Sequence, residues 1–259
     1  MKISGVCILI LSGSHLLSQT ADFEKRFYFN SPLRIARGAS TSTSNPAMMA
    51  SKDLVFGMNS TQIFSIQAFN EYSFFLFNSY KNALQGLYLT YQPTYSFGFV
   101  ETAIPFNLRV SEQLHLGLTL GATFFNNGSD SGPATKFFGT IGTAHRFTTR
   151  WVLHVAVGLK TRKQMTVGYS YLTGIQYFSS ENLSWEACTF FPNDGSFHAS
   201  IGGELMRSKS MSFRTGITMV IWSYYAGIQL KTNNVIIDFQ IKHFSIPGSV
   251  YHSACLYSQ

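Results

Sequence analysis

The chain has 259 residues, enough for one large all-β domain or two small ones. Charged residues make up 12% of it, against a usual fraction of roughly a quarter, whereas aromatic residues reach 15%. The formal net charge of +7 is spread along the chain without a Lys/Arg block or a basic helix, so no nucleic-acid partner is predicted. So little charge does not suit the surface of a soluble protein.

The first 19 residues are typical of a secretory signal peptide. Met1 and Lys2 precede an apolar run over residues 6–11, which is followed by the small and polar sequence SGSHLLSQ. The run is far shorter than the roughly 20 residues that a spanning helix needs, so we expect export and cleavage near Gln19 rather than a membrane anchor. The alternative is a short buried N-terminal strand. Removal of Lys2 leaves 18 basic and 12 acidic side chains and a net charge of +6.

Residues 20–50 precede the first predicted strand and have no strand pattern. Their second half, RIARGASTSTSNPAMMA, is rich in small and polar residues up to Asn45 and Pro46, where a turn is expected to begin. A fourteen-strand barrel has room inside for such a segment, so we expect it to fold into the lumen as a plug. The alternative is a mobile periplasmic tail, because Ser/Thr richness predicts mobility as well.

From about Ser51 onward the chain divides into segments of about ten residues that are separated by turn signals, and no stretch has a sustained helical period. An even number of such segments is what a barrel of neighbouring antiparallel strands requires. The fourteen predicted strands cover residues 52–59, 70–80, 84–92, 97–109, 113–125, 135–147, 150–160, 167–178, 182–191, 196–206, 209–219, 222–231, 234–244 and 249–258.

The links between these segments alternate in length. Short links such as SE, TT and NN take turns with longer ones such as PTYSF, NNGSDSGPA and TRKQMT. This alternation is typical of outer-membrane barrels, in which tight turns lie at the periplasmic rim and long loops at the outer rim. A soluble Greek-key sandwich has no reason to maintain it.

The side chains within the predicted strands alternate between apolar and small or polar. In segment 150–160 the large apolar residues occupy every second position from Trp151, and Val152 is the one exception on the other face. Segments 113–125, 209–219 and 234–244 have the same pattern. The other faces are too rich in Gly, Ser and Thr and too poor in charge for a soluble exterior, so we predict lipid outside and a polar lumen inside.

Aromatic residues near the segment ends fit interfacial girdles, although aromatics favour strands everywhere. They are Phe147, Trp151, Trp185, Phe191, Trp222, Tyr224 and Tyr257. After export two cysteines remain, Cys188 and Cys255. We expect both to be small apolar fillers without a disulfide.

The inward register also predicts a set of lumen-facing ionisable residues in which basic groups outnumber acidic ones. They form either a weakly anion-preferring interior or a network of paired charges that maintains the shape of the barrel. The set comprises Glu101, Arg109, Lys136, Arg146, Arg150, His154, Lys160, Glu186, His198, Glu204, Arg214, Lys231, Asp238 and Lys242.

Three stretches resemble a known family. SNPAMMA before the first strand resembles the Asn-Pro-Ala-Gly motif of FadL-like outer-membrane β-barrels, particularly the PorV and PorQ group of the Bacteroidota. GFVETAIPFNLRVSEQLHLGLTLGATFF and the ending SIPGSVYHSACLYSQ are similar to that group's paired central strands and final strand. The resemblance implies a fourteen-strand barrel with an N-terminal hatch, whose motif here is Asn45, Pro46, Ala47, Met48 and Met49. Met48 replaces the family's usual Gly, and the chain is shorter than typical relatives.

Enzymatic chemistry has no specific signature in this sequence. No Gly-x-Ser-x-Gly elbow is present, and isolated histidines such as His115 and His154 are expected to be polar strand residues. The sequence NNGSDSG, residues 126–132, has oxygen donors but lacks the spaced acidic ligands of a calcium site. We therefore predict no enzyme, no cofactor and no metal site.

Taken together, the sequence predicts an all-β protein, an antiparallel transmembrane barrel of about fourteen strands with an N-terminal plug segment. The expected parts are a signal peptide (1–19), a hatch or periplasmic segment (20–50) and the barrel (51–259), located in the bacterial outer membrane after export. The favoured function is that of a PorV/PorQ-like accessory of type IX protein secretion. The alternatives are a FadL-like channel for hydrophobic solutes and a secreted soluble β-sandwich that binds a partner. Expected partners are outer-membrane lipid and either secretion-machinery proteins or apolar solutes.

Overall fold

The computed structural model describes twelve stretches of the chain. They are residues 45–49, 54–63, 70–93, 98–125, 134–161, 167–180, 182–191, 197–208, 210–219, 223–232, 234–244 and 248–258. The predicted signal peptide and residues 20–44 of the predicted plug lie outside the described residues, as do the predicted girdle residue Trp222 and the sequence NNGSDSG.

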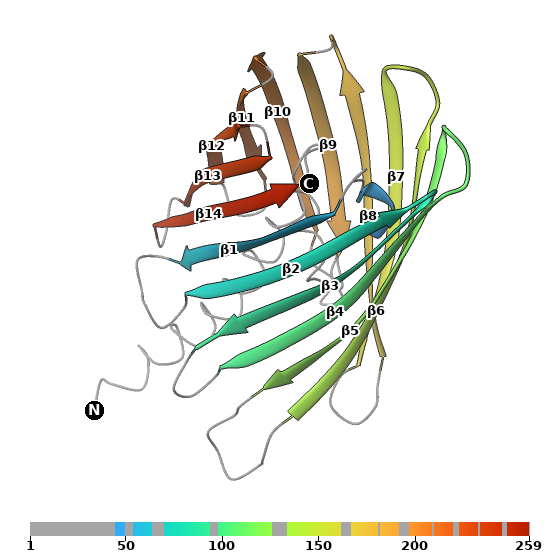
Figure 1. The fold of residues 1–259 in the computed structure, drawn as a ribbon, viewed down its shortest axis with the longest axis vertical. Helices are drawn as coiled ribbons and strands as arrows, with labels where there is room; N and C mark the ends of the chain where they lie inside the picture. The colour runs from blue at the N-terminus through green and yellow to red at the C-terminus, as the bar shows by residue number, and fades with distance from the viewer. Residues whose placement is uncertain are drawn as a thin grey trace.

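Within the described residues, fourteen antiparallel strands close into one barrel, because β1 pairs with β14 (Figure 1). Each other strand pairs with its neighbours in the chain. The strands are β1 (Val55–Ile63), β2 (Glu71–Tyr80), β3 (Ala83–Gln92), β4 (Phe99–Arg109), β5 (Leu114–Phe125), β6 (Ala134–Arg146), β7 (Trp151–Thr161), β8 (Val167–Phe178), β9 (Leu183–Phe191), β10 (His198–Ser208), β11 (Met211–Thr218), β12 (Ser223–Thr232), β13 (Val235–Phe244) and β14 (Ser249–Ser258). A 3₁₀ turn, η1 (Pro46–Met48), precedes β1.

Each of the fourteen predicted segments corresponds to one of these strands, so the predicted fold class is confirmed. The closed barrel also makes the alternative of a two-sheet sandwich wrong. The largest difference concerns the first strand, which was predicted over 52–59 and runs from Val55 to Ile63. Residues 60–62 are polar and resemble a loop in the sequence. Thr61, however, is buried, and its hydroxyl lies 2.9 Å from His252 Nδ1 on β14, so these polar residues belong to the wall.

The short links all lie at the end of the barrel where β1 begins and β14 ends, which we call the short-turn end. Hydroxyl side chains stabilise them locally. Ser111 Oγ accepts hydrogen bonds from the backbone N–H groups of Gln113 and Leu114, and Thr148 Oγ1 accepts from those of Arg150 and Trp151. Such side-chain turns satisfy backbone groups that the sheet leaves unpaired, which explains why links as short as SE and TT suffice.

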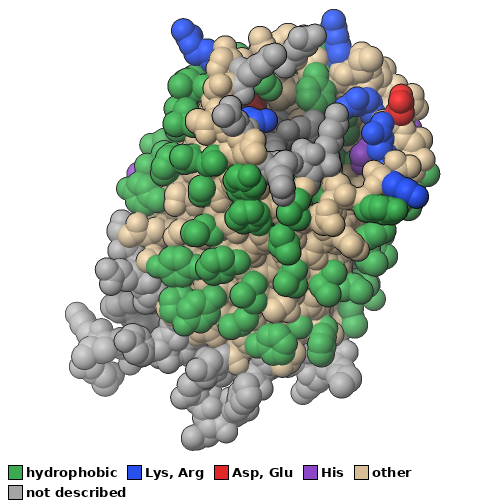
Figure 2. All heavy atoms as spheres, in the orientation of Figure 1, with side chains coloured by type: hydrophobic (Ala, Val, Ile, Leu, Met, Phe, Trp, Pro, Cys, Tyr) green, Lys and Arg blue, Asp and Glu red, His purple; other side chains and the backbone are tan. Residues whose placement is uncertain are grey.

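The outer face of the barrel is apolar. Ile104, Leu120 and Ile141 have 62%, 57% and 64% of their surface exposed, whereas Thr119 and Asp238 on inward positions have 0%. Figure 2 shows hydrophobic side chains covering the side wall of the barrel, with Lys and Arg at one rim. The predicted register of the strands is therefore confirmed. Large apolar side chains face outward and polar ones inward, which is the opposite of the arrangement in a soluble protein. Among the described residues, no helix is long and apolar enough to cross a membrane.

A buried network of charges links β10 to β13 on the inner face. Arg214 Nη2 on β11 donates to Asp238 Oδ1 on β13 at 2.7 Å and to Gln229 Oε1 on β12 at 2.8 Å. Its Nε lies 3.7 Å from Glu204 Oε1 on β10, which also accepts a hydrogen bond from Ser212. The Arg214 guanidinium thus connects four successive strands. Because the network is buried, removal of one charged member leaves an opposite charge buried without its partner, which is costly.

The apolar outer face predicts a depth-dependent cost of charge. Leu120→Arg, in the middle of β5, should lower the free energy of unfolding in lipid by about 2–4 kcal/mol, because the guanidinium would face hydrocarbon. Val110→Arg, in the turn after β4, should cost about 0–1 kcal/mol, since it lies near the interface. Denaturant titration of vesicle-embedded protein measures both. Equal costs at the two positions would mean that no hydrocarbon surrounds the barrel.

The network around Arg214 predicts strong coupling. Arg214→Met alone should cost about 3–5 kcal/mol of unfolding free energy, since two carboxylates would lose their cation. Adding Asp238→Asn should recover a substantial part of this cost. Arg109→Met, at an exposed rim position, should change the same quantity by only about 0.5 kcal/mol. A double-mutant cycle in which the two buried changes are additive would contradict the coupling.

Candidate functional site

The segment Asn45–Met49 lies inside the barrel, and all five of its residues are buried. Figure 1 places η1 within the ring of strands. The local sequence explains the turn: Asn45 caps it by accepting a hydrogen bond from Ala47 N–H at 3.0 Å, and Pro46 occupies the first position, where no N–H is needed. Backbone bonds from Met48 to Asn45 and from Met49 to Pro46 complete it.

Two asparagine side chains hold the segment to the wall. The Asn45 amide donates to the backbone carbonyls of Thr143 on β6 and Val155 on β7, both at 3.1 Å. From β4, the Asn107 amide donates to the carbonyls of Pro46 and Met49 at 2.9 and 2.7 Å. Each bond contributes only about 0.5–1.5 kcal/mol net, but a buried carbonyl that loses its donor costs about 1–3 kcal/mol.

Two glycines make room for the segment. Gly117 on β5 and Gly142 on β6 are direct cross-strand partners, and Gly117 also faces Asn107 on β4. A Cβ atom at Gly117 would overlap the backbone of Pro46 and Ala47, and one at Gly142 would overlap the Asn45 side chain. The wall is therefore bare where the segment docks, which lets its backbone lie directly on the sheet.

Met48 and Met49 pack on different parts of the inner wall. Met48 contacts a small cluster with Ala47, Ala144 and Val152, which explains why Val152 breaks the alternation of β7. Met49, with 1% of its surface exposed, belongs to a larger apolar cluster. That cluster also contains Val55, Phe75, Phe77, Leu84, Tyr88, Ala103, Phe138, Ile236, Ala254 and Leu256.

The prediction of a polar lumen therefore holds for only part of the inner wall. Inward side chains of β1–β4, β6, β13 and β14 pack with Met49 in a buried apolar cluster, whereas β10–β13 carry the Arg214 network. Phe75 and Tyr88 stack there with ring centroids 6.4 Å apart. The error arose because small and polar residues dominate the inward positions of the other strands, while β2 carries large aromatics on both faces.

The predicted lumenal charges fall into two groups. Glu101, His154, Glu186, His198, Arg214, Asp238 and Lys242 are buried, and Lys136, Lys160 and Glu204 are half-buried. Arg109, Arg146, Arg150 and Lys231 are exposed at the short-turn end, because each lies at the end of a strand or in a turn. These four share the inward register of their strands but lie at the rim, so their lumenal position stays a prediction.

The buried charges have partners on the wall. Thr123 donates to Glu101 at 2.9 Å, and Lys242 lies 4.6 Å from the ring centre of Phe244. His154 Nε2 lies 2.9 Å from Glu186 Oε1. These contacts favour the interpretation of a network that maintains the wall over that of an anion-preferring interior.

Some site residues were not predicted. Asn107, Gly117 and Gly142 dock the segment, yet no sequence motif marks them. The available signal was their shared inward register. These three inward positions have a polar amide or no side chain, whereas the outward positions of the same strands are rich in Leu and Phe. Cys188 was expected to be an apolar filler, but it lies beside Glu186 and His154.

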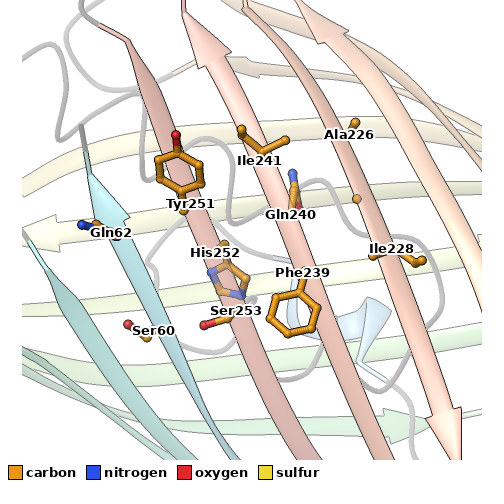
Figure 3. A pocket seen from close by; sticks show the side chains of 11 residues that line it. Ser60, Gln62, Ala226, Ile228, Phe239, Gln240, Ile241, Tyr251, His252 and Ser253 are labelled. Carbon is orange, nitrogen blue, oxygen red and sulfur yellow. The ribbon is translucent and has the colours of Figure 1, made fainter. Parts of the chain in front are cut away.

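A separate hollow of about 480 Å³ lies on β12–β14 and β1 (Figure 3). Exposed Phe239, Ile241 and Tyr251 line it, together with the small Ser60 and Ser253, which pair across the β1–β14 seam. Because these lining residues occupy outward positions of their strands, the hollow lies on the outer face of the barrel.

No family model and no curated protein matches this chain. Solved structures do. The toluene transporter TodX of Pseudomonas putida has a TM-score of 0.62 and 12% identity over 90% of this chain and 98% of its own. The monoaromatic hydrocarbon channel CymD has a TM-score of 0.59 and 11% identity over 85% and 93%.

The outer membrane protein Omp33 of Acinetobacter baumannii is also similar, with a TM-score of 0.54 and 9% identity over 80% of this chain and 98% of its own. At such low identity the likeness concerns the fold alone. The fold of this chain is accordingly FadL-like, whereas the narrower likeness to the PorV and PorQ group has no support among these structures.

Proposed function

We propose that this protein is an outer-membrane channel for small apolar solutes, and that the segment Asn45–Met49 is its hatch. The observation that carries the proposal is the burial of Met49 in an apolar cluster of inward side chains. A channel for sugars or ions needs a hydrogen-bonding surface along its lumen, whereas this part of the wall offers rings and aliphatic side chains. TodX and CymD, which share the fold, are named for toluene and monoaromatic hydrocarbons.

The proposed location follows from the same features. An apolar outer face fits a bilayer, and the predicted signal peptide of residues 1–19 would bring the chain to the outer membrane. The proposed partners are outer-membrane lipid and apolar solutes. The type IX interpretation rested on short sequence motifs, and no contact in the described residues favours a secretion partner.

An uptake experiment tests the solute class. Cells that lack their own hydrophobic-solute channel should accumulate radiolabelled toluene faster when they express this protein, while their uptake of a labelled disaccharide stays unchanged. Uptake equal to that of the empty-vector control, with the barrel detected in the outer membrane, would overturn the proposal. Retention of secreted cargo in a deletion strain of the native host, without any change in toluene uptake, would favour the type IX alternative.

The docking of the hatch can be tested separately. Gly142→Ala places a methyl group against Asn45 and should release the segment, giving larger single-channel conductance in planar bilayers. Gly139→Ala on the same strand is the matched control, because its methyl group would meet Leu120 Cδ2 at 3.4 Å and Thr119 O at 3.6 Å, which are ordinary contacts. Unchanged conductance of a folded Gly142→Ala barrel would mean that the segment does not restrict the passage.

A further inference from the structure

A compact cluster of three metal-ligating side chains lies on the inner wall. His154 on β7 and Glu186 and Cys188 on β9 bring one ligand atom each within 4.8 Å of the others. His154 Nε2 lies 2.9 Å from Glu186 Oε1 and 3.7 Å from Cys188 Sγ, and the Cys188 thiol lies 3.2 Å from the same Glu186 oxygen. All three residues are at most 4% exposed.

The sheet register brings these residues together. His154, Gly174 on β8 and Cys188 are successive cross-strand partners, so His154 and Cys188 are two strand spacings apart, or about 10 Å. Their side chains meet above Gly174, where a Cβ atom would overlap both the thiol and the imidazole. Glu186 precedes Cys188 by two residues and faces the same side. The glycine is thus a requirement of the cluster.

From this geometry we infer a binding site for a divalent transition metal of the zinc class, held by His154 Nε2, Glu186 and Cys188 Sγ. Thiolate and imidazole are ligands that Zn²⁺ and Co²⁺ prefer, whereas Ca²⁺ and Mg²⁺ prefer oxygen alone. In a tetrahedral zinc site such ligand atoms lie about 3.3–3.6 Å apart. The three separations here need to change by less than about 0.5 Å to reach that geometry.

A second observation points to a ligand. Gln176 on β8 is the cross-strand partner of Glu186, it has 0% of its surface exposed, and neither its amide oxygen nor its amide nitrogen has a hydrogen-bond partner among the described residues. A buried amide without hydrogen-bond partners is destabilising, so it calls for an explanation. Gln176 lies next to the Glu186 carboxylate on the inward side. A metal held by the three protein ligands would leave its fourth coordination position open to the Gln176 amide oxygen or to a water.

Three protein ligands with one further position match the zinc sites that accept an exchangeable ligand. Binding forms a metal–sulfur bond and breaks the S–H bond of Cys188, whose proton leaves to solvent. The metal would also brace β7 against β9 across β8. The backbone carbonyl of Val155, the residue after His154, accepts a hydrogen bond from the Asn45 amide. The proposed metal site therefore lies beside the docked segment. The inference does not depend on the proposed solute.

Cobalt titration of the full-length protein in detergent tests the site. The wild type should bind one Co²⁺ with a thiolate-to-cobalt charge-transfer band, and Cys188→Ser should lose this band. Cys255→Ser is the matched control, because it removes the exposed thiol of β14 and should keep the band. Absence of the band in the wild type, or its persistence in Cys188→Ser, would overturn the inference and leave a hydrogen-bonded cluster only.

A second variant and a second readout protect the test against misfolding. Glu186→Gln keeps the side-chain volume and should weaken Zn²⁺ binding at least about tenfold in competition with a chelator, because the anionic ligand is lost. Zn²⁺ should raise the melting temperature of the wild type and of Cys255→Ser but not that of Cys188→Ser. Equal Zn²⁺ affinity of Glu186→Gln and the wild type would contradict the proposed ligand set.

Discussion

The pairing of β1 with β14 is the constraint on which the rest of the structure depends. Nine consecutive residue pairs, from Val55 with Ser258 to Ile63 with Val250, close the sheet, so that every strand has two neighbours. A closed sheet satisfies its own backbone hydrogen bonds, which allows its outer face to be apolar without exposing a polar edge. Closure also creates an interior, and the sequence then has to fill or line that interior with every second residue of each strand.

The fold was largely predictable because its information is local. Alternation with period two and the turn residues mark each strand, and the exposed Leu and Phe of β5 occupy the positions that the pattern predicts. The first strand was misplaced because Ser60, Thr61 and Gln62 are three consecutive polar residues, which resemble a loop in the sequence although they lie in the wall. Register alone put Arg109 and Arg146 on the inner face, but register does not reveal how close to the rim a residue lies.

The candidate site was less predictable because its contacts join distant parts of the chain. Asn107 lies 61 residues from Pro46, and Cys188 lies 34 residues from His154. The sequence marked Asn45 and Pro46 as a turn and Val152 as an exception, but only the barrel brings Val152 beneath Met48. A pattern of period two states which face a residue is on. It does not state which residue of a non-adjacent strand lies opposite.

Inward glycines connect these observations. Several lie beside a large ring on the neighbouring strand: Phe77 fills the space above Gly86, Phe138 that above Gly121, and Tyr225 that above Gly216. Rings that cover glycines in this way restore packing to a strand that would otherwise be weakened. At Gly117 and Gly142 the occupant is instead the Asn45–Met49 segment, and at Gly174 it is the pair of His154 and Cys188. An inward glycine thus marks a place where the wall accepts a group from another strand or segment, as it does at the proposed hatch and at the proposed metal site.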